Sequence, residues 1–360
     1  MKSNQQSCKY KTIERGEFYL FMVARINYLK HIMKKDSLTE QITLNTEIAR
    51  NAIEQYNFQS AKLKFLKHLE NTTFKLSTLQ GNFLLRVYCG FHNTVQDMES
   101  EAKMIEYLSS CNNYQYQKPI RNSSHSFVSM VEASGISKPV SILSWIDSPI
   151  IGHQVNDLSL FEKLGKLIAH IHNQLAQWQK PIDFHRPMLD ADGLIGKNGA
   201  LGYGISGYRY FDGETVSLFE SVYQRLIDFE TVAGKEKNIF GIIHGDLHLN
   251  NVILHQNTLI PIDFDDSGYG YYIYDLAVLL ANYWGILEYS EIKTKLLQGY
   301  RKIAELSIEI ENQLPLFIAA RYIFIALYLA GKSEEESIKQ TALEYIPSYI
   351  EKLKDIIAYV

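Results

Sequence analysis

The sequence has few cysteines, and its charges nearly cancel. Among 360 residues there are only 3 cysteines, and the formal net charge at pH 7 is -4. Cys8, Cys89 and Cys111 lack the spacing of metal ligands, and their odd number favours reduced thiols in a reducing compartment. The small net charge gives no global reason to bind a polyanion. We therefore expect a cytoplasmic protein without a nucleic-acid partner.

The chain also lacks long hydrophobic runs in its first part. The most apolar early run, Phe18 to Ala24, is followed by Arg25. It is much shorter than the roughly 20 apolar residues that a membrane helix needs. The start does not show the ordered basic, apolar and small-residue regions of a secretory signal. We expect no membrane partner.

The length of the chain fits two packed units that share a cleft. We expect an N-terminal extension over 1–40, a first lobe over 41–146 and a second lobe over 147–360. The periodicity of apolar residues predicts helices and strands within these lobes. The predicted helices are Thr43–Tyr56, one that opens near Asp97, and Leu158–Trp178; the predicted strands are Lys62–Leu69, Thr72–Leu76, Phe83–Tyr88, Ser126–Glu132 and Pro139–Trp145.

The second lobe is predicted to be mostly helical, with one unusual stretch. Residues 186–215 carry seven glycines and predict an exposed functional loop or flap. Beyond residue 275 the sequence is helical throughout. The tyrosines between 269 and 274 are compatible either with a substrate pocket or with packing of the loop on the second lobe.

The most informative segment runs from Gly241 to Asp266. An apolar strand leads to His244-Gly245-Asp246, a short loop ends at Asn251, and a later strand leads to Asp263. The order of strands and loops brings two carboxylates and an amide to the mouths of neighbouring strands. Phosphoryl transfer requires a carboxylate that orients the attacking hydroxyl and oxygen ligands for Mg²⁺. Asp246 suits the first role, and Asn251 and Asp263 suit the second.

These residues resemble the aminoglycoside phosphotransferase and choline kinase branch of the protein-kinase-like superfamily. The branch has a catalytic loop H-G-D-x-H-x-x-N and a metal aspartate in I-D-F/W, which correspond to residues 244–251 and 262–264 here. The resemblance covers roughly residues 45–330. It implies an α+β fold with two lobes, in which a small antiparallel sheet precedes a larger helical lobe, and it implies ATP and Mg²⁺ as cofactors.

The resemblance also assigns supporting roles near the catalytic loop. His244 corresponds to a structural support of the loop, and Asp275 to a buried aspartate that holds the loop through backbone hydrogen bonds. Asp265 and Asp266 adjoin the metal aspartate, where a second ion, the substrate or a solvated loop face are all open readings. His248 and His255 lack further ligands at metal spacing, so His248 is best interpreted as part of the loop.

In the first lobe the resemblance points to Arg86 and Glu101. They correspond to the strand cation that contacts the nucleotide phosphates and to its helix partner. Arginine replaces the lysine of protein kinases, and a surface salt bridge is the alternative reading. A second departure is the absence of glycine between Lys62 and Leu76, which excludes a glycine-rich phosphate loop there.

Three further residues occupy the place of the interlobe hinge, whose backbone pairs with adenine in this family. They are Ser144, Trp145 and Ile146. For Trp145 a role in the hydrophobic core is an equal alternative.

We therefore expect a phosphotransferase that moves the γ-phosphate of ATP to a hydroxyl group of a small molecule, such as an amino-alcohol or an aminoglycoside-like compound. Two alternatives stay open. One is a serine/threonine protein kinase, because residues 263–266 also resemble the Asp-x-Asp-Asp variant of bacterial stress-response kinases. The other is a nucleotide-binding pseudokinase, for which the altered cation Arg86 is the argument.

Overall fold

The computed structural model describes residues 38–69, 71–90, 93–111, 114–152 and 157–360. The predicted extension over 1–40 lies almost entirely outside the described residues. The chain divides into two units, Met1–Leu44 and Asn45–Val360, and the second unit contains every described strand. The first described helix, α2 (Leu38–Ile53), begins five residues before the predicted start at Thr43.

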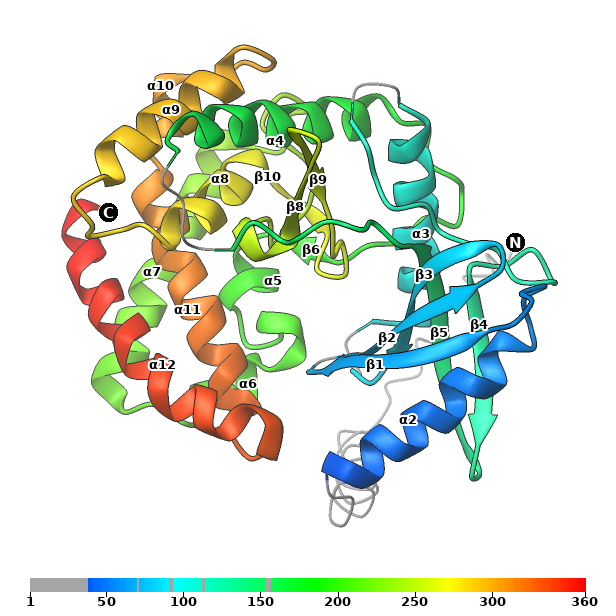
Figure 1. Cartoon of the computed structure of the whole chain (residues 1–360). Helices are drawn as coiled ribbons and strands as arrows, with labels where there is room; N and C mark the ends of the chain where they lie inside the picture. The colour runs from blue at the N-terminus through cyan, green and yellow to red at the C-terminus, as the bar shows by residue number, and fades with distance from the viewer. Residues whose placement is uncertain (1–37, 70, 91–92, 112–113, 153–156) are drawn as a thin grey trace, which may run out of the picture. The chain divides into compact units, whose positions relative to one another are not determined.

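A five-stranded antiparallel sheet forms the N-terminal lobe, in the order β1-β2-β3-β5-β4 (Figure 1). All five predicted strands are confirmed, with ends shifted by a few residues. The strands are β1 Lys62–His68, β2 Asn71–Thr78, β3 Gly81–Tyr88, β4 Val128–Ala133 and β5 Ile136–Ser144. Between β3 and β4 lies α3 (Val95–Ser110), where Thr94 and Asp97 form a capping box that fixes the helix start.

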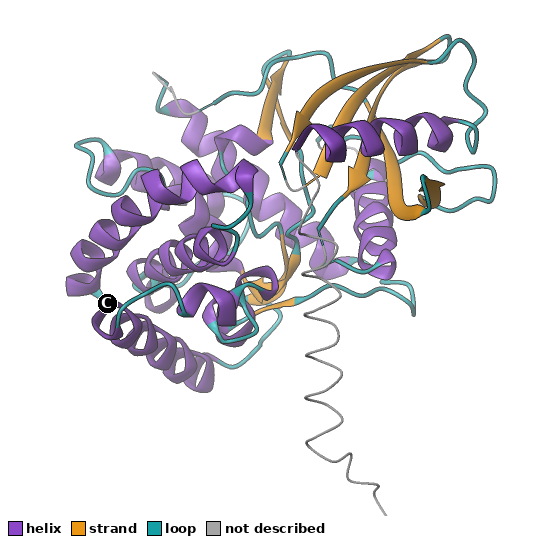
Figure 2. Cartoon of the chain, turned by 90° about the horizontal axis from the view of Figure 1, so that it is seen from below, coloured by secondary structure: helices purple, strands orange, loops and turns teal. Residues whose placement is uncertain are grey.

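The remaining residues form a mostly helical lobe, as predicted. Its helices are α4 Ser159–Gln177, α5 Ala191–Ile195, η1 Ala200–Gly202, α6 Gly204–Tyr208, α7 Gly213–Ala233, η2 Leu249–Asn251, α8 Tyr272–Ala281, α9 Tyr289–Arg301, α10 Ile308–Glu311, α11 Leu314–Gly331, α12 Glu336–Ile356 and η3 Ile357–Tyr359. Its strands are the sheet β6 Met188–Leu189, β10 Gly268–Tyr271 and β7 Phe240–Ile243, and the hairpin β8 Val252–His255 and β9 Thr258–Pro261. Figure 2 shows these strands as short pieces among the helices.

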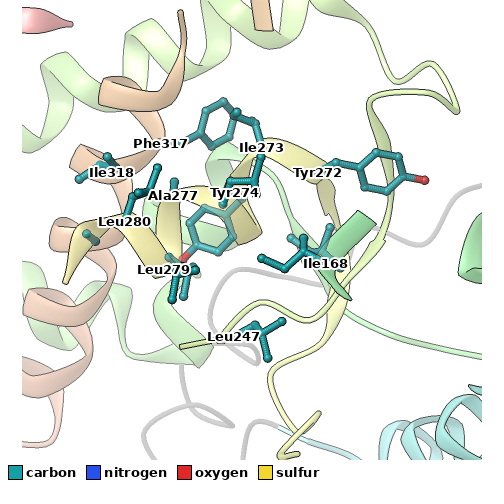
Figure 3. Close-up of a cluster of buried hydrophobic side chains, with 14 of the residues drawn as sticks. Ile168, Leu247, Tyr272, Ile273, Tyr274, Ala277, Leu279, Leu280, Phe317 and Ile318 are labelled. Atoms are coloured by element: carbon teal, nitrogen blue, oxygen red, sulfur yellow. The ribbon is translucent and has the colours of Figure 1, made fainter. Parts of the chain in front are cut away.

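The core of the helical lobe is built on α8, which is buried along its whole length. Figure 3 shows Tyr274 and Leu280 of α8 close to Phe317 and Ile318 of α11. Three tyrosines of the aromatic run, Tyr271, Tyr272 and Tyr274, are buried in this core. Packing is therefore the confirmed reading for these three tyrosines, and α8 gives the catalytic loop a rigid base.

One apolar stretch, Ile308–Gly331, is long enough to cross a membrane by length and composition. However, 78% of its most apolar window is buried inside the protein. A helix that is apolar on all sides is typical of the centre of a globular core. Here it contains α11, which packs on α6, α8 and α12.

The prediction of an exposed flap over 186–215 is wrong. This stretch folds into β6, α5, η1 and α6, and Leu194, Ile195 and Ala200 in it are completely buried or nearly so. Its glycines allow close packing: a side chain at Gly207 would collide with the backbone of Leu327 on α11. Glycine clusters favour loops when only the local sequence is considered, but here the absence of a side chain brings two backbones together.

Candidate active site

Asp275, on α8, holds the loop that carries Asp246 through hydrogen bonds to its backbone. β7 leads into His244, and the carboxylate of Asp275 accepts hydrogen bonds from the backbone N–H of His244 at 2.9 Å and of Gly245 at 2.8 Å. Gly245 has φ +81°, and a side chain there would collide with the carbonyl of Asp266. The predicted buried, loop-holding role of Asp275 is confirmed, and the glycine is required by the backbone.

A histidine that the sequence analysis did not single out supports Asp275. His172, on α4, lies 3.0 Å through Nε2 from Oδ2 of Asp275, and its Nδ1 lies 3.0 Å from the hydroxyl of Tyr300. Because a carboxylate only accepts hydrogen bonds, Nε2 is the donor in the contact with Asp275. The ring also stacks on Tyr272 at 4.4 Å. The only sequence signal was a histidine on the apolar face of a helix.

His244 connects the catalytic loop to the segment that carries Asp263. Its Nε2 donates to the carbonyl of Ile262 at 3.1 Å, and its Nδ1 accepts from the backbone N–H of Asp246 at 3.3 Å. Burial lowers the pKa of His244, against the opposing charges of Asp275 and Asp246. A neutral ring fits one donor and one acceptor, so the predicted structural role of His244 is confirmed.

Both carboxylate oxygens of Asp246 have partners. Oδ2 accepts from Nδ2 of Asn251 at 2.9 Å and lies 3.4 Å from Nε2 of His248. Oδ1 pairs with Nη2 of Arg321, which lies on α11. Burial raises the pKa of Asp246, but the charge of Arg321 and the contact with His248 outweigh it, so the pKa lies well below its usual value. Asp246 is therefore ionised, and the structure brings it together with Asn251 as predicted.

Asp263 follows the end of β9 by two residues and has a left-handed backbone, with φ +65°. Such a conformation is costly for a non-glycine residue and is concentrated at functional sites. Its Oδ1 accepts from Nη2 of Arg86 at 3.1 Å, and its side chain is 40% exposed. The carboxylate thus points to accessible space while one oxygen is held by the first lobe.

Arg86 and Glu101 form a buried ion pair. The Nη1 of Arg86 lies 3.1 Å from Oε1 of Glu101, and the side chains are only 4% and 3% exposed. The alternative of a surface salt bridge is therefore wrong. Burial raises the pKa of Glu101 to about 7, against the opposing charge of Arg86. The guanidinium joins the buried carboxylate of Glu101 on α3 to the partly exposed carboxylate of Asp263.

Asp265 lies in a network that the sequence did not reveal. Its side chain is buried, so the reading of a solvated loop face is wrong for this residue. Oδ2 accepts from Nδ2 of Asn71 at 2.8 Å, and Oδ1 accepts from Nδ2 of Asn93 at 2.9 Å. Arg186 donates to the backbone carbonyls of Phe264, Asp265 and Ser267. These contacts fix the loop after Asp263, and isolated asparagines at sequence distances of more than 150 residues gave no signal of them.

The predicted hinge residues have different surroundings. The N–H of Ser144 donates to the carbonyl of Lys118 at 2.8 Å, and that of Trp145 donates to Asn82 at 3.1 Å. Lys75 lies over the Trp145 ring at 4.5 Å. Ile146 is buried beside Ile253 and Ile260 of the β8–β9 hairpin and, within the described part of the chain, its backbone makes no hydrogen bond.

The histidines near the loop do not form a metal centre of their own. Among the described residues no group of three or more His, Cys, Asp or Glu side chains is placed to hold a metal ion. His255 instead lies 2.6 Å through Nδ1 from the hydroxyl of Ser148. Cys89 and Cys111 are free thiols.

The sequence was compared with models of known protein families and with known proteins and structures. Residues 62–307 match the model of the phosphotransferase enzyme family (APH). The chain belongs to this family. The matched range contains the whole five-stranded sheet, the catalytic loop and Asp263, and the fold of this phosphotransferase is the kinase-like two-lobe fold predicted from the motif.

Individual relatives are distant. Amicoumacin kinase of Bacillus subtilis (strain 168) is 19% identical over 78% of this chain and 83% of its own length. The structure of the microcompartment-associated aminopropanol kinase superposes with a TM-score of 0.75 at 21% identity, covering 87% of this chain and 98% of that one. Amicoumacin kinase hAmiN in complex with AMP-PNP, Ca²⁺ and Ami gives a TM-score of 0.71 at 20% identity, covering 86% and 93%. These likenesses show the fold of the phosphotransferase.

Proposed function

We propose that this phosphotransferase moves the γ-phosphoryl group of ATP to a hydroxyl group of a small molecule, in the presence of Mg²⁺. The observation that carries the proposal is the joined set of Asp246, Asn251 and Asp263. Asn251 contacts Asp246 directly, and the bond from His244 to Ile262 connects their loop to the segment of Asp263. A phosphoryl-transfer site uses little covalent chemistry and depends on such positioning.

Asp246 is the proposed catalytic base. Its carboxylate orients the hydroxyl of the acceptor and accepts the proton as the oxygen bonds to phosphorus. The depressed pKa keeps it ionised at neutral pH, and the side chain remains 21% exposed and so can be reached by an acceptor. A weakly basic carboxylate is adequate where the proton is transferred late, as in a loose transition state.

Asn251 and Asp263 are the proposed ligands of Mg²⁺. The amide nitrogen of Asn251 donates hydrogen bonds to Asp246, which leaves Oδ1 of Asn251 to coordinate a metal ion. Asp263 has a partly exposed carboxylate. One carboxylate and one amide oxygen fit a Mg²⁺ ion that takes its other ligands from phosphate and water. When bound, the ion would neutralise the charge that develops on the phosphate oxygens.

Arg86 is the proposed phosphate-binding cation and Glu101 its anchor. Glu101 takes Nη1, so Nη2, which faces Asp263 here, is the nitrogen directed to the site of the metal and the phosphates. Ser144, Trp145 and Ile146 are the proposed hinge at the adenine. Of these, Ile146 is supported best, because its backbone is unpaired within the described residues and it packs on apolar side chains of the second lobe.

The proposed acceptor class is an amino-alcohol or an aminoglycoside-like compound. The similarity to an aminopropanol kinase and to an amicoumacin kinase supports this class. The carboxylates of Asp246 and Asp263 offer partners for a cationic acceptor. We further propose a cytoplasmic protein that uses no nucleic-acid or membrane partner, which the free thiols of Cys89 and Cys111 support.

A calorimetric titration of ATP, with and without Mg²⁺, tests the nucleotide site. Wild-type protein should bind ATP more tightly with Mg²⁺, and Asp263→Ala should lose that dependence while it keeps its fold. Absence of ATP binding by folded wild-type protein would contradict the proposed function. Arg86→Ala should weaken ATP binding. An unchanged affinity would refute the phosphate-binding role of Arg86 and leave it a structural role in the ion pair with Glu101.

The base is tested separately. Asp246→Asn should abolish phosphoryl transfer to acceptors found in a screen of amino-alcohols, while ATP affinity changes little, because the interaction is lost only in the transition state. Substantial turnover by this variant would refute the role of Asp246. Transfer to a generic protein substrate, with none to small alcohols, would instead favour a protein kinase.

A further inference from the structure

A buried arginine on α11, Arg321, contacts the catalytic loop, and no motif in the sequence points to it. Arg321 lies in the middle of α11 and is the only charged residue of that helix. It is 8% exposed, while 13 of its helix neighbours are buried apolar residues. A buried charge in an apolar helix costs free energy unless it is paired, and such sites often stabilise no better than a hydrophobic residue of similar size. Stability alone therefore gives a poor account of Arg321.

Its ion-pair partner is the proposed base. Nη2 of Arg321 contacts Oδ1 of Asp246, and Asn251 takes Oδ2 at 2.9 Å. Arg321 on Oδ1, and Asn251 with His248 on Oδ2, define the plane of the carboxylate and leave the remaining lone pairs for an acceptor hydroxyl. Asn251 comes from the same loop, five residues away, but Arg321 comes from a helix 75 residues away in sequence. The orientation of Asp246 is thus tied to the helical core.

The second terminal nitrogen of Arg321, Nη1, does not contact Asp246. Nη1 is buried beside the hydroxyl of Tyr274, and among the residues that the structure describes neither atom has a hydrogen-bond partner in ordinary geometry. The ion pair with Asp246 therefore rests on one nitrogen, not on a bidentate fork. A lysine at this position can supply one such contact, whereas a methionine fills the volume without it.

We propose that Arg321 is a positioning residue, which holds Asp246 of the proposed phosphotransferase in the orientation that receives the acceptor hydroxyl. The inference rests on the proposed function of Asp246. Arg321 itself cannot serve as the base, since the pKa of its guanidinium is raised by the charge of Asp246, despite burial, and it stays protonated. Its effect on the reaction passes through the carboxylate alone.

The experiment is a double-mutant cycle of Arg321→Met and Asp246→Asn. The rate measured is that of ADP formation from Mg²⁺-ATP, first with water as the acceptor and then with 1-amino-2-propanol as the probe alcohol. Arg321→Met should lower kcat by about 100-fold, the size of effect that a misplacement of about 1 Å produces. The KM for Mg²⁺-ATP should change less than about 2-fold, because no nucleotide contact is altered. Arg321→Lys should recover most of the loss.

In the Asp246→Asn background, Arg321→Met should cause no further loss, because the group that Arg321 positions is already inactive. Lys332→Met is the matched control, since Lys332 is another buried cation, at the C-terminal end of the same helix, and pairs with Glu335. This control should keep kcat within about 2-fold. Thermal unfolding of every variant establishes that it is folded at the assay temperature.

The outcomes separate the two proposals. Wild-type protein that neither binds ATP nor forms ADP overturns the proposed function and this inference with it. Active wild-type protein with inactive Asp246→Asn but unchanged Arg321→Met overturns this inference alone. Equal losses from Arg321→Met in both backgrounds, or no recovery with lysine, also overturn it, because the effect would then not pass through Asp246.

Discussion

Replacing Asp275 by asparagine tests whether the catalytic loop depends on the carboxylate beneath it. In the wild-type protein Asp275 accepts three hydrogen bonds, from the backbone of His244 and Gly245 and from Nε2 of His172. Asparagine of the same shape offers only one acceptor oxygen. If that oxygen takes the place of Oδ2, the new amide group faces the N–H of Gly245, which then has no acceptor.

The expected loss can be estimated from the contacts. A hydrogen bond to a charged group contributes about 1.5–3 kcal/mol, and a buried donor left without a partner costs about 1–3 kcal/mol. The two remaining bonds become weaker because the acceptor is neutral. We expect Asp275→Asn to lower the free energy of unfolding by about 3 kcal/mol. A domain with a typical stability of about 5–15 kcal/mol remains folded after such a loss.

Urea denaturation followed by tryptophan fluorescence measures this change. Asp212→Asn is the matched control, because Asp212 caps α7 through its side chain and asparagine is an equally good cap. The control should change stability by less than about 0.5 kcal/mol. The kcat of Asp275→Asn should also fall by about 100-fold, since Gly245 is adjacent to Asp246.

The effect should depend on pH with a definite sign. Burial raises the pKa of Asp275, but the hydrogen bond and charge of His172 outweigh it and the pKa is lowered. A lowered pKa means that the stabilisation is complete above the unfolded value of about 3.9 and is lost as the pH falls through the folded value. The difference between wild type and Asp275→Asn should shrink below about pH 4. A variant as stable as the Asp212→Asn control would refute the reasoning.

Three further predictions concern packing, charge and the loop after Asp263. Gly165→Ala should destabilise the protein by about 1–3 kcal/mol in urea unfolding, because the new methyl group meets the backbone of α9, whereas Gly213→Ala, with open space around it, should be neutral. The stability of Glu101→Gln relative to wild type should increase by up to about 3 kcal/mol as the pH rises from 4.5 to 8. The pKa of Glu101 is raised to about 7 in the folded protein, so wild type loses stability over this range, whereas the neutral variant does not; parallel curves of stability against pH would contradict this. Arg186→Met should lower stability by about 2–4 kcal/mol and weaken Mg²⁺-dependent ATP binding, since it frees carbonyls beside Asp265; unchanged binding in calorimetry would show that the loop needs no such support.

The sequence predicted most of the strands and the short loop that carries Asp246 and Asn251. Alternation of apolar residues and turns at 71 and 81–82 located three strands that the structure has at 62–68, 71–78 and 81–88. These signals are local, since a strand is defined by neighbours within a few residues. The loop from His244 to Asn251 was equally readable, because its residues act together within eight positions.

The glycines of 186–215 show where local reasoning fails. Their number favoured an exposed flap, but Gly207 is buried against α11, more than 100 residues further along the chain. Long distances in sequence, from 79 to 194 residues, also hid Asn71, Asn93 and Arg186, whose bonds to the Asp265 segment join residues from both lobes. A residue type alone does not reveal such partners.

By itself the sequence determined the family of the protein and indicated the residues that we propose as base and metal ligands, because those residues lie in two short motifs close together in the chain. The tertiary structure decided how these motifs are held. Asp275 and His172 fix the loop from α8 and α4, and Arg321 reaches Asp246 from α11. These contacts arise only when helices far apart in the chain pack together, since a buried charge finds its partner through the fold and not through its neighbours in sequence.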